Sequence, residues 1–249
     1  MHWDEGKSMD PQHTIHNAVS NIICSIVFGE RFEYDNKRFS YLLKILNNHF
    51  MLTGSAAGQI FNLAPFIKHF PGPHQKVMQN FTELLSFIRD EIKEHKETLD
   101  PDSPRDFIDA YLLEIEKQKS NEGSTFHEEN MVMSVLDLFL AGTDTTSTTI
   151  RWGLIYLIQN PDVQERCHEE IVRVLGYDRL PTAIFSDKEH WKHPDAFNPE
   201  NFLDENGNFF KPESFIAFSL GPRVCLGETL ARTELFLYIT SLLQQIQFS

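Results

Sequence analysis

The ten residues from Phe218 to Gly227 contain the side chain best suited to chemistry, a cysteine between two glycines. Cys225 follows Arg223 by two positions, and a helical pattern of apolar residues begins directly after Gly227. The unpaired amide groups and the macrodipole at a helix N-terminus favour an anion, so this position favours the thiolate form of cysteine. We therefore expect Cys225 to act either as a nucleophile or as a metal ligand.

The other cysteines and the histidines bear on that choice. A cysteine nucleophile needs a histidine base, and no histidine lies near Cys225 in the sequence, although a fold can bring one close. A zinc site needs several ligands at short spacings, and Cys24 and Cys167 have no such spacing with Cys225. An axial thiolate on haem iron needs a single cysteine.

The segment 218–227, FSLGPRVCLG, resembles the haem-binding loop of cytochrome P-450 enzymes, Phe-x-x-Gly-x-Arg-x-Cys-x-Gly, at every fixed position. The resemblance implies that Cys225 is the axial ligand of haem iron and that Arg223 pairs with a haem propionate. It further implies that Phe218 shields the thiolate and that Gly227 allows the ring to approach closely. The alternative is a buried structural cysteine beside a loop.

A long helix is expected from a capping box at residues 125–128, TFHE, to about Ile158. Its first half is apolar on all sides, which is typical of a helix in the centre of a protein. The segment 141–149, AGTDTTSTT, breaks that pattern, because glycine and β-branched residues cost stability in a helix interior. Threonine hydroxyls can also bond to i−4 carbonyls and bend the helix.

This interruption resembles the distal-helix motif of the P-450 family, Ala/Gly-Gly-x-Asp/Glu-Thr-Thr/Ser, at every position. The resemblance implies that the small residues Ala141 and Gly142 leave room for dioxygen over the iron. It also implies that Asp144 and Thr145 relay protons to the oxygen. Taken alone, the segment can equally be a polar patch whose hydroxyls bond to their own backbone.

The apolar spacing predicts further helices around these two motifs, with Cys24 in the core. Their expected ranges are 14–29, 36–52, 74–98, 106–116, 160–176 and a last one after Gly227. Residues 60–73 form an expected aromatic loop, which either contacts a membrane, substrate or partner or fills the core. The pair Glu170 and Arg173 has the family's Glu-x-x-Arg form, but we interpret it as a solvent-facing pair on the wrong helix.

Composition narrows the possible partners. The 249-residue chain has 22 basic and 36 acidic side chains and a net charge of −14, which argues against binding nucleic acid or docking electrostatically on anionic lipid. Three cysteines without pairing spacing favour a reducing compartment without disulfides. We expect neither a signal sequence nor a transmembrane anchor in this chain.

The resemblance extends over almost the whole chain. Residues 28–32, FGERF, and 71–75, PGPHQ, are most similar to the animal microsomal family two, and closest to its subfamily J. Residues 199–202, PENF, resemble the family's Pro-Glu-Arg-Phe segment with Asn201 in place of arginine. The interval between Gly176 and Pro199 is too short for the family's Glu-x-x-Arg helix and several strands. We therefore expect a shortened form, which also lacks the amino-terminal anchor, the early helices and the usual residues after the last helix.

The resulting prediction is a mainly α protein, residues 1–249 forming one partial cytochrome P-450 domain with little β structure. By resemblance it is a haem-thiolate monooxygenase that inserts one atom of dioxygen into apolar substrates, namely fatty acids such as arachidonate and xenobiotics. Electrons would come from an NADPH-cytochrome reductase at the cytoplasmic face of the endoplasmic reticulum membrane, with membrane association expected from the family despite the absent anchor. The alternative is a non-catalytic helical remnant with impaired haem binding.

Overall fold

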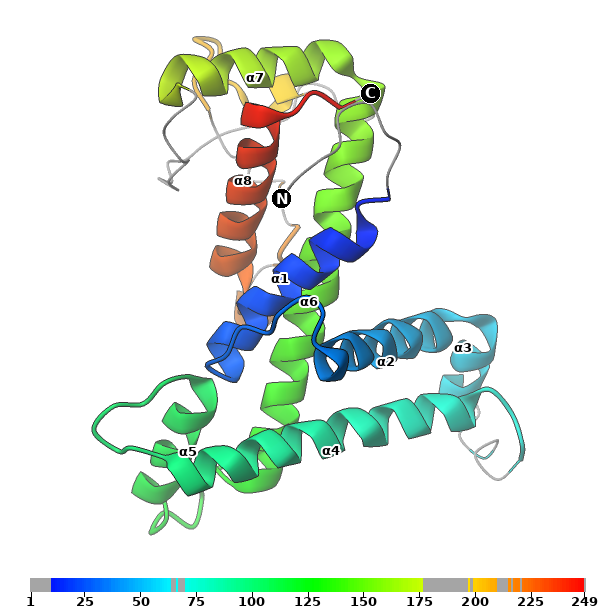
Figure 1. Ribbon diagram of the computed structural model, residues 1–249, viewed down its shortest axis with the longest axis vertical. Coiled ribbons are helices and arrows are strands. Elements are labelled where there is room, and N and C mark those ends of the chain that lie inside the picture. Colours follow the sequence, from blue (N-terminus) through cyan, green and yellow to red (C-terminus); the bar gives the residue numbers. More distant parts are fainter. Residues whose placement is uncertain are drawn as a thin grey trace. The chain divides into compact units, whose positions relative to one another are not determined.

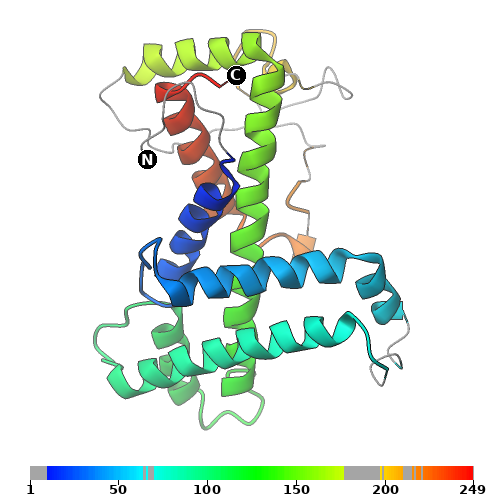
Figure 2. The same cartoon turned by 45° about the vertical axis from the view of Figure 1, so that its right-hand side comes forward.

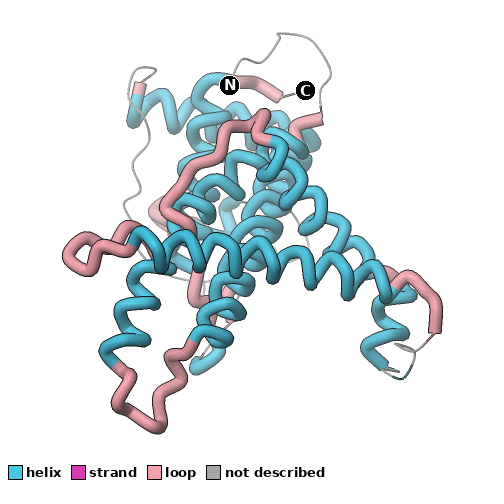
Figure 3. The backbone as a smooth tube through the Cα atoms, turned by 60° about the horizontal axis from the view of Figure 1, so that its bottom comes forward, coloured by secondary structure: helices cyan, strands magenta, loops and turns pink. Residues whose placement is uncertain are grey.

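The computed structural model describes residues 10–63, 66, 70–176, 197, 199–209, 215, 217–219 and 221–248. Within these residues every regular element is a helix, and the β structure is an isolated antiparallel bridge between Leu203 and Phe209 (Figure 3). The predicted mainly α fold is therefore confirmed. The interval 177–196 that the sequence analysis singled out lies outside the described residues.

Most of the helices follow one another with short connections, whereas residues 176–227 separate α7 from α8. They are α1 (Gln12–Val27), α2 (Lys37–Gly54), α3 (Ala56–Leu63), α4 (His74–Thr98), α5 (Phe107–Lys117), α6 (Glu128–Gln159), α7 (Pro161–Leu175) and α8 (Glu228–Gln245), with the 3-10 turns η2 (Pro199–Phe202) and η3 (Gly221–Arg223) before α8. The chain divides into two compact units, one of residues His16–Asp144 and one of Thr145–Ser249 with Met1–Ile15. That residues 1–249 form one domain stays a prediction.

In the unit His16–Asp144, α2 and α4 lie side by side and are connected at one end through α3 (Figure 2). The connection is tight at Gly58, where a Cβ would lie 2.4 Å from the carbonyl oxygen of Leu52. Apolar residues at spacings of three and four form one buried side on each helix, as an amphipathic pattern requires. These residues are Phe39, Leu42, Leu43 and Leu46 on α2 and Leu84, Ile88 and Ile92 on α4.

Aromatic rings connect the same helices to α6. The ring of Phe28, just after α1, lies 5.6 Å from that of Phe87 on α4 and 5.9 Å from that of Phe139 on α6, centroid to centroid. Cys24 is fully buried in this core, and burial raises the pKa of its thiol strongly. Its assignment as a core residue is thus confirmed, and its thiol stays protonated.

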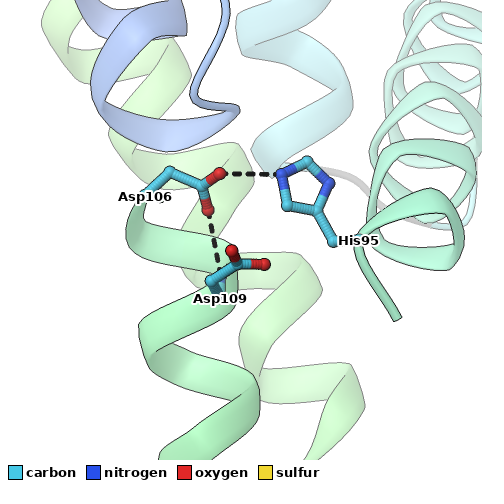
Figure 4. A group of neighbouring side chains, drawn as sticks. All are labelled: His95, Asp106 and Asp109. Atoms are coloured by element: carbon cyan, nitrogen blue, oxygen red, sulfur yellow. Dashed lines mark hydrogen bonds and ion pairs between the residues drawn. The ribbon is translucent and has the colours of Figure 1, made fainter. Parts of the chain in front are cut away.

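A buried cluster of His95, Asp106 and Asp109 connects α4 to α5 (Figure 4). Asp106 is the N-cap of α5, and its Oδ1 accepts a hydrogen bond from the Asp109 amide at 2.9 Å. Its Oδ2 lies 2.8 Å from His95 Nε2, while His95 Nδ1 donates to the carbonyl oxygen of Glu91 at 2.8 Å. One side chain therefore satisfies a helix end and a buried histidine together.

In the second unit, α7 packs across α8 near the C-terminal end of α8 (Figure 1). Leu157, Val163 and Leu243 form the buried core between α6, α7 and α8. The Gln164 side chain pairs with the backbone of Phe248, donating to its carbonyl at 3.0 Å and accepting from its amide at 2.6 Å. The chain after α8 is therefore held against α7 by both polar groups of a single buried amide.

Two local predictions need correction. Residues 60–63 belong to α3 and not to a loop, although Ile60, Leu63, Phe66 and Phe70 are all more than half exposed. Helix α6 begins at Glu128, and the amide of Asn130 donates to His127 Nδ1 at 3.2 Å, so a histidine caps the helix and not the predicted Thr125. Among the described residues, no helix is long and apolar enough to cross a membrane.

Replacing Asp106 by alanine tests the buried cluster. The change removes the cap of α5 and leaves His95 buried without its partner, so we expect the free energy of unfolding to fall by about 3 kcal/mol. Urea unfolding followed by circular dichroism measures the loss. Asp102→Ala, an exposed position in the preceding loop, is the control. Equal effects of both changes would contradict the role of the cluster.

Candidate functional site

The cysteine loop is a compact turn directly before α8. The Cys225 amide donates to the Phe218 carbonyl at 2.9 Å, and the Val224 amide donates to the Gly221 carbonyl at 3.0 Å. Gly221 has a φ of 71°, in the left-handed region that glycine adopts without steric cost. Gly227 is the N-cap residue of α8. The loop thus places Cys225 at the N-terminus of a helix, where the sequence predicted it.

The sulfur of Cys225 lies on an open apolar surface. Cys225 is exposed, and its neighbours Val224 and Leu226 are 48% and 90% exposed. A Cβ added at Gly227 would come within 4.0 Å of the Cys225 sulfur, and one added at Gly221 would meet open space. An exposed thiol with exposed apolar neighbours and no side chain at either glycine fits a flat apolar ligand. The residues present therefore fit a haem group, and a buried structural cysteine is excluded.

Phe218 is fixed from the side by an arginine that the sequence analysis did not single out. The guanidinium of Arg232 lies 4.9 Å from the ring centre of Phe218 and 5.4 Å from that of Phe215. Arg232 also pairs with Glu228 at 2.8 Å on the first turns of α8. The Glu228/Arg232 spacing of four residues was the available sequence signal. Arg223, the predicted propionate partner, is exposed at the end of η3.

The threonine-rich segment does not interrupt α6, which runs continuously from Glu128 to Gln159. The hydroxyl of Thr149 donates to the carbonyl of Thr145 at 2.7 Å, so back-bonding to the i−4 carbonyl occurs as predicted. Ala141 and Thr145 are exposed one turn apart, and Asp144 is half-buried. That these residues and Cys225 face one ligand stays a prediction.

Gly142 has a packing role within the unit His16–Asp144. A Cβ at this position would lie 2.3 Å from Cδ1 and 2.7 Å from Cγ1 of Ile23 on α1. The absent side chain therefore allows α1 to approach α6. That Gly142 also leaves room for dioxygen stays a prediction.

Glu234 is a buried residue of α8 that the sequence analysis missed. Its side chain is 3% exposed and is hydrogen-bonded by the hydroxyl of Thr146 on α6. Burial raises the pKa of the Glu234 carboxyl to about 7, and the bond from Thr146 opposes that rise in part. Its spacing from Leu230 and Leu237 puts it on the apolar side of the last helix, which was the signal in the sequence.

Two other groups of polar residues have structural roles. His95, Asp106 and Asp109 offer ligand atoms within 4.8 Å of one another, but Arg105 binds the Asp109 carboxylate with bonds of 2.6 and 2.9 Å. That arginine lowers the pKa of Asp109 and leaves the cluster electrostatically paired without a metal. Glu170 and Arg173 form an exposed ion pair on α7, as predicted for a solvent-facing pair.

A helical fold, an exposed thiol directly before the last helix and a threonine-rich long helix agree with the resemblance of the two motifs to the P-450 family. The sequence profile of the family described as Cytochrome P450 matches residues 1–183 and 179–249. The chain therefore belongs to the cytochrome P450 family. This is a family of monooxygenases, and membership implies the haem-thiolate cofactor that the cysteine loop predicted.

Curated relatives match nearly the whole chain. Cytochrome P450 2J2 from Homo sapiens is 42% identical over 300 residues, which cover 98% of this chain and 60% of the relative. Cytochrome P450 2J3 from Rattus norvegicus is 41% identical over 298 residues, covering 98% and 59%, and cytochrome P450 2B9 from Mus musculus is 39% identical over 295 residues, covering 96% and 60%. These identities support the predicted position in family two, closest to subfamily J.

The same matches locate the shortened region. The chain spans about 60% of the length of the curated relatives it matches. The aligned stretch of 300 residues is longer than the 249-residue chain, so the relative has residues with no counterpart here. The family profile matches in two pieces that meet at residues 179–183. This is the interval where the sequence lacks room for the Glu-x-x-Arg helix, so the predicted shortening is confirmed.

Gly142→Ala tests the contact between α6 and α1. Because the new methyl group overlaps Ile23, we expect a loss of stability of about 1 to 3 kcal/mol. The double variant Gly142→Ala/Ile23→Ala should lose less than the sum of the two single changes, since the smaller residue makes room. Gly54→Ala, where the added methyl meets open space, is the matched control. Additive losses in urea unfolding would contradict a direct contact.

The thiols of Cys225 and Cys24 should differ sharply in reactivity. Cys225 is exposed and Cys24 is fully buried, so native protein treated with iodoacetamide should be labelled first at Cys225. Labelling of Cys24 needs opening of the core and should be slower by roughly 100-fold or more. Peptide mass spectrometry over time measures both rates. Equal protection of both thiols would show that the cysteine loop is buried.

Proposed function

We propose that the chain carries the thiolate loop and the oxygen-handling helix of a haem-thiolate monooxygenase. The observation that supports this most directly is the exposed sulfur of Cys225 at the N-terminus of α8. It stands in a loop that matches the family's motif at every fixed position. A single accessible cysteine side chain could supply the one protein sulfur ligand that haem iron needs.

Each residue of the loop has a distinct role in this proposal. Cys225 would hold the iron, and the positive charge of the exposed Arg223 would pair with a propionate. Phe218, whose ring centre lies 4.9 Å from the Arg232 guanidinium, would shield the thiolate when haem is bound. Gly227 and Gly221 leave space for the porphyrin face. When bound, haem supplies the reductive activation of dioxygen, and the thiolate's electron donation favours O–O cleavage.

The residues of α6 handle dioxygen and protons in the same proposal. Ala141 has a small and exposed side chain, so the helix surface at this position would admit a small ligand. At Gly142 the space that a side chain would take is filled by Ile23. The Thr145 hydroxyl is exposed and the Asp144 carboxyl directly precedes it on α6. An exposed hydroxyl beside a carboxyl can accept a proton on one side and donate one on the other.

The proposed substrates and partners follow from the family resemblance. We propose apolar substrates, namely fatty acids such as arachidonate and varied xenobiotics, as the resemblance of the motifs to the family implies. Electrons come from an NADPH-cytochrome reductase, and the site of action is the cytoplasmic face of the endoplasmic reticulum membrane. The net charge of −14 argues against nucleic acid as a partner.

A second candidate is a non-catalytic helical remnant with impaired haem binding. The break in the family profile at residues 179–183 favours it, because the relatives have additional residues there. Those residues would complete walls of the haem pocket in a longer chain. Binding of haem by the purified chain separates the two candidates.

The test is the absorption spectrum of the purified chain after reconstitution with haem, reduction and exposure to carbon monoxide. A thiolate-ligated enzyme gives a red-shifted Soret band, which Cys225→Ala should abolish. Cys167→Ala removes a half-buried thiol on α7 and should leave the band unchanged. Haem should also slow iodoacetamide labelling of Cys225. Absence of any Soret band would favour the remnant.

A further inference from the structure

Glu234 is the buried charged group that the proposed function does not use. It is 3% exposed on α8, and one of its carboxyl oxygens takes a hydrogen bond from Thr146. The other oxygen, Oε1, has no hydrogen-bond partner in the part of the chain that the structure describes. A buried carboxylate with a single donor is expensive, because burial removes the water that would solvate its charge.

Thr146 connects Glu234 to the oxygen-handling segment of α6. It is 3% exposed and directly follows Thr145, which points to the exposed side of the helix. When a helix turns about its axis, the side chains of consecutive residues turn together. A bond that fixes Thr146 therefore also fixes the direction in which Thr145 leaves the helix. Both Thr145 and Glu234 belong to the same compact unit.

The charged groups along the two contacting helices do not account for the state of Glu234. On α8, Glu228 and Arg232 are paired with each other at 2.8 Å. On α6, Arg151 lies more than one turn beyond Thr146, and Asp144 lies before it. The causes of the raised pKa are burial first, with the opposing bond from Thr146.

We propose that Glu234 is a positioning residue whose buried carboxyl, bonded to Thr146, holds the turn of α6 that carries Thr145 in one orientation. The role of Thr145 in proton transfer rests on the proposed function. The hold on α6 does not, since it requires only α6 and α8. Ionisation of Glu234 strengthens the single bond from Thr146, but it also creates a buried charge whose Oε1 has no partner among the described residues. The ionised state therefore favours local opening of the contact between α6 and α8.

The proposal fixes the sign of a pH effect. The carboxyl has an ordinary pKa of 4.5, and in the folded chain this rises to about 7. The folded chain therefore binds a proton that the unfolded chain releases between these pH values. The contribution of Glu234 to stability is present below pH 4.5 and is lost as the pH rises through about 7.

The first experiment compares urea unfolding midpoints of the unsubstituted chain and Glu234→Gln between pH 5 and 8. Glutamine keeps an oxygen for Thr146 and cannot ionise, so the two midpoints should be similar at pH 5. The variant should unfold at a higher urea concentration at pH 8. Glu169→Gln, an exposed glutamate on α7, should follow the unsubstituted chain at every pH. If the difference in urea midpoint between Glu234→Gln and the unsubstituted chain is the same at every pH, the proposal that Glu234 is neutral in the folded chain at low pH is wrong.

The second experiment measures amide hydrogen exchange of residues 145–149, corrected for the intrinsic effect of pH. Exchange should be at least several-fold faster in Glu234→Ala than in Glu234→Gln, because alanine removes the acceptor for Thr146. In the unsubstituted chain, exchange should speed up between pH 6 and 8, and in Glu234→Gln it should not. Equal exchange in all three proteins would overturn the positioning role.

Both measurements read the chain without haem, so their result is independent of the proposed function. If the exchange pattern appears but no Soret band forms, Glu234 positions α6 and the monooxygenase proposal fails. If the Soret band forms but exchange is the same in all variants, the cofactor site stands and the role of Glu234 is wrong.

Discussion

A polar group that is buried without a hydrogen-bond partner costs stability, and this constraint shapes the buried side of α6. The buried side is apolar at first, then carries hydroxyls, then is apolar again. Its members are Met131, Val132, Val135, Leu136 and Phe139, then Thr143, Thr146 and Ser147, then Ile150, Leu154 and Leu157. Thr143, Thr146 and Ser147 occupy positions where apolar side chains would stabilise the folded chain more. This hydroxyl stretch coincides with the segment whose exposed side carries Ala141 and Thr145.

The buried hydroxyl groups of α6 need hydrogen-bond partners, which a neighbouring helix can supply. The exposed Thr149 donates to the Thr145 carbonyl within the helix, whereas the buried Thr146 bonds to the carboxyl of Glu234. A leucine in place of that glutamate would pack as well and leave the Thr146 hydroxyl without this partner. The polar stretch of α6 thus accounts for an acidic residue on the apolar side of α8. Polar residues on the buried side of this segment stabilise the folded chain less than apolar ones would. Such a sacrifice of stability is consistent with a functional surface on the exposed side of the segment.

The ends of helices were predicted best where proline or glycine residues stand next to them. Helix α4 has its predicted ends, and α7 begins at Pro161 and stops before Gly176, whose φ is 69°. Helix α3 has only eight residues and too little periodicity to separate it from a loop. The cysteine loop could be predicted from the sequence because its hydrogen bonds join residues fewer than ten positions apart. The contacts of Gly142 with Ile23 and of Glu234 with Thr146 join distant segments, so no local pattern could reveal them.

The same distinction explains why a shortened chain can keep the thiolate loop intact. The loop's own bonds run from Cys225 to Phe218 and from Val224 to Gly221, all within ten residues. The helix that follows is held at its far end by α7 through Leu243 and by the pairing of Gln164 with Phe248. The conformation of the cysteine loop therefore depends first on hydrogen bonds within the loop itself, directly before α8.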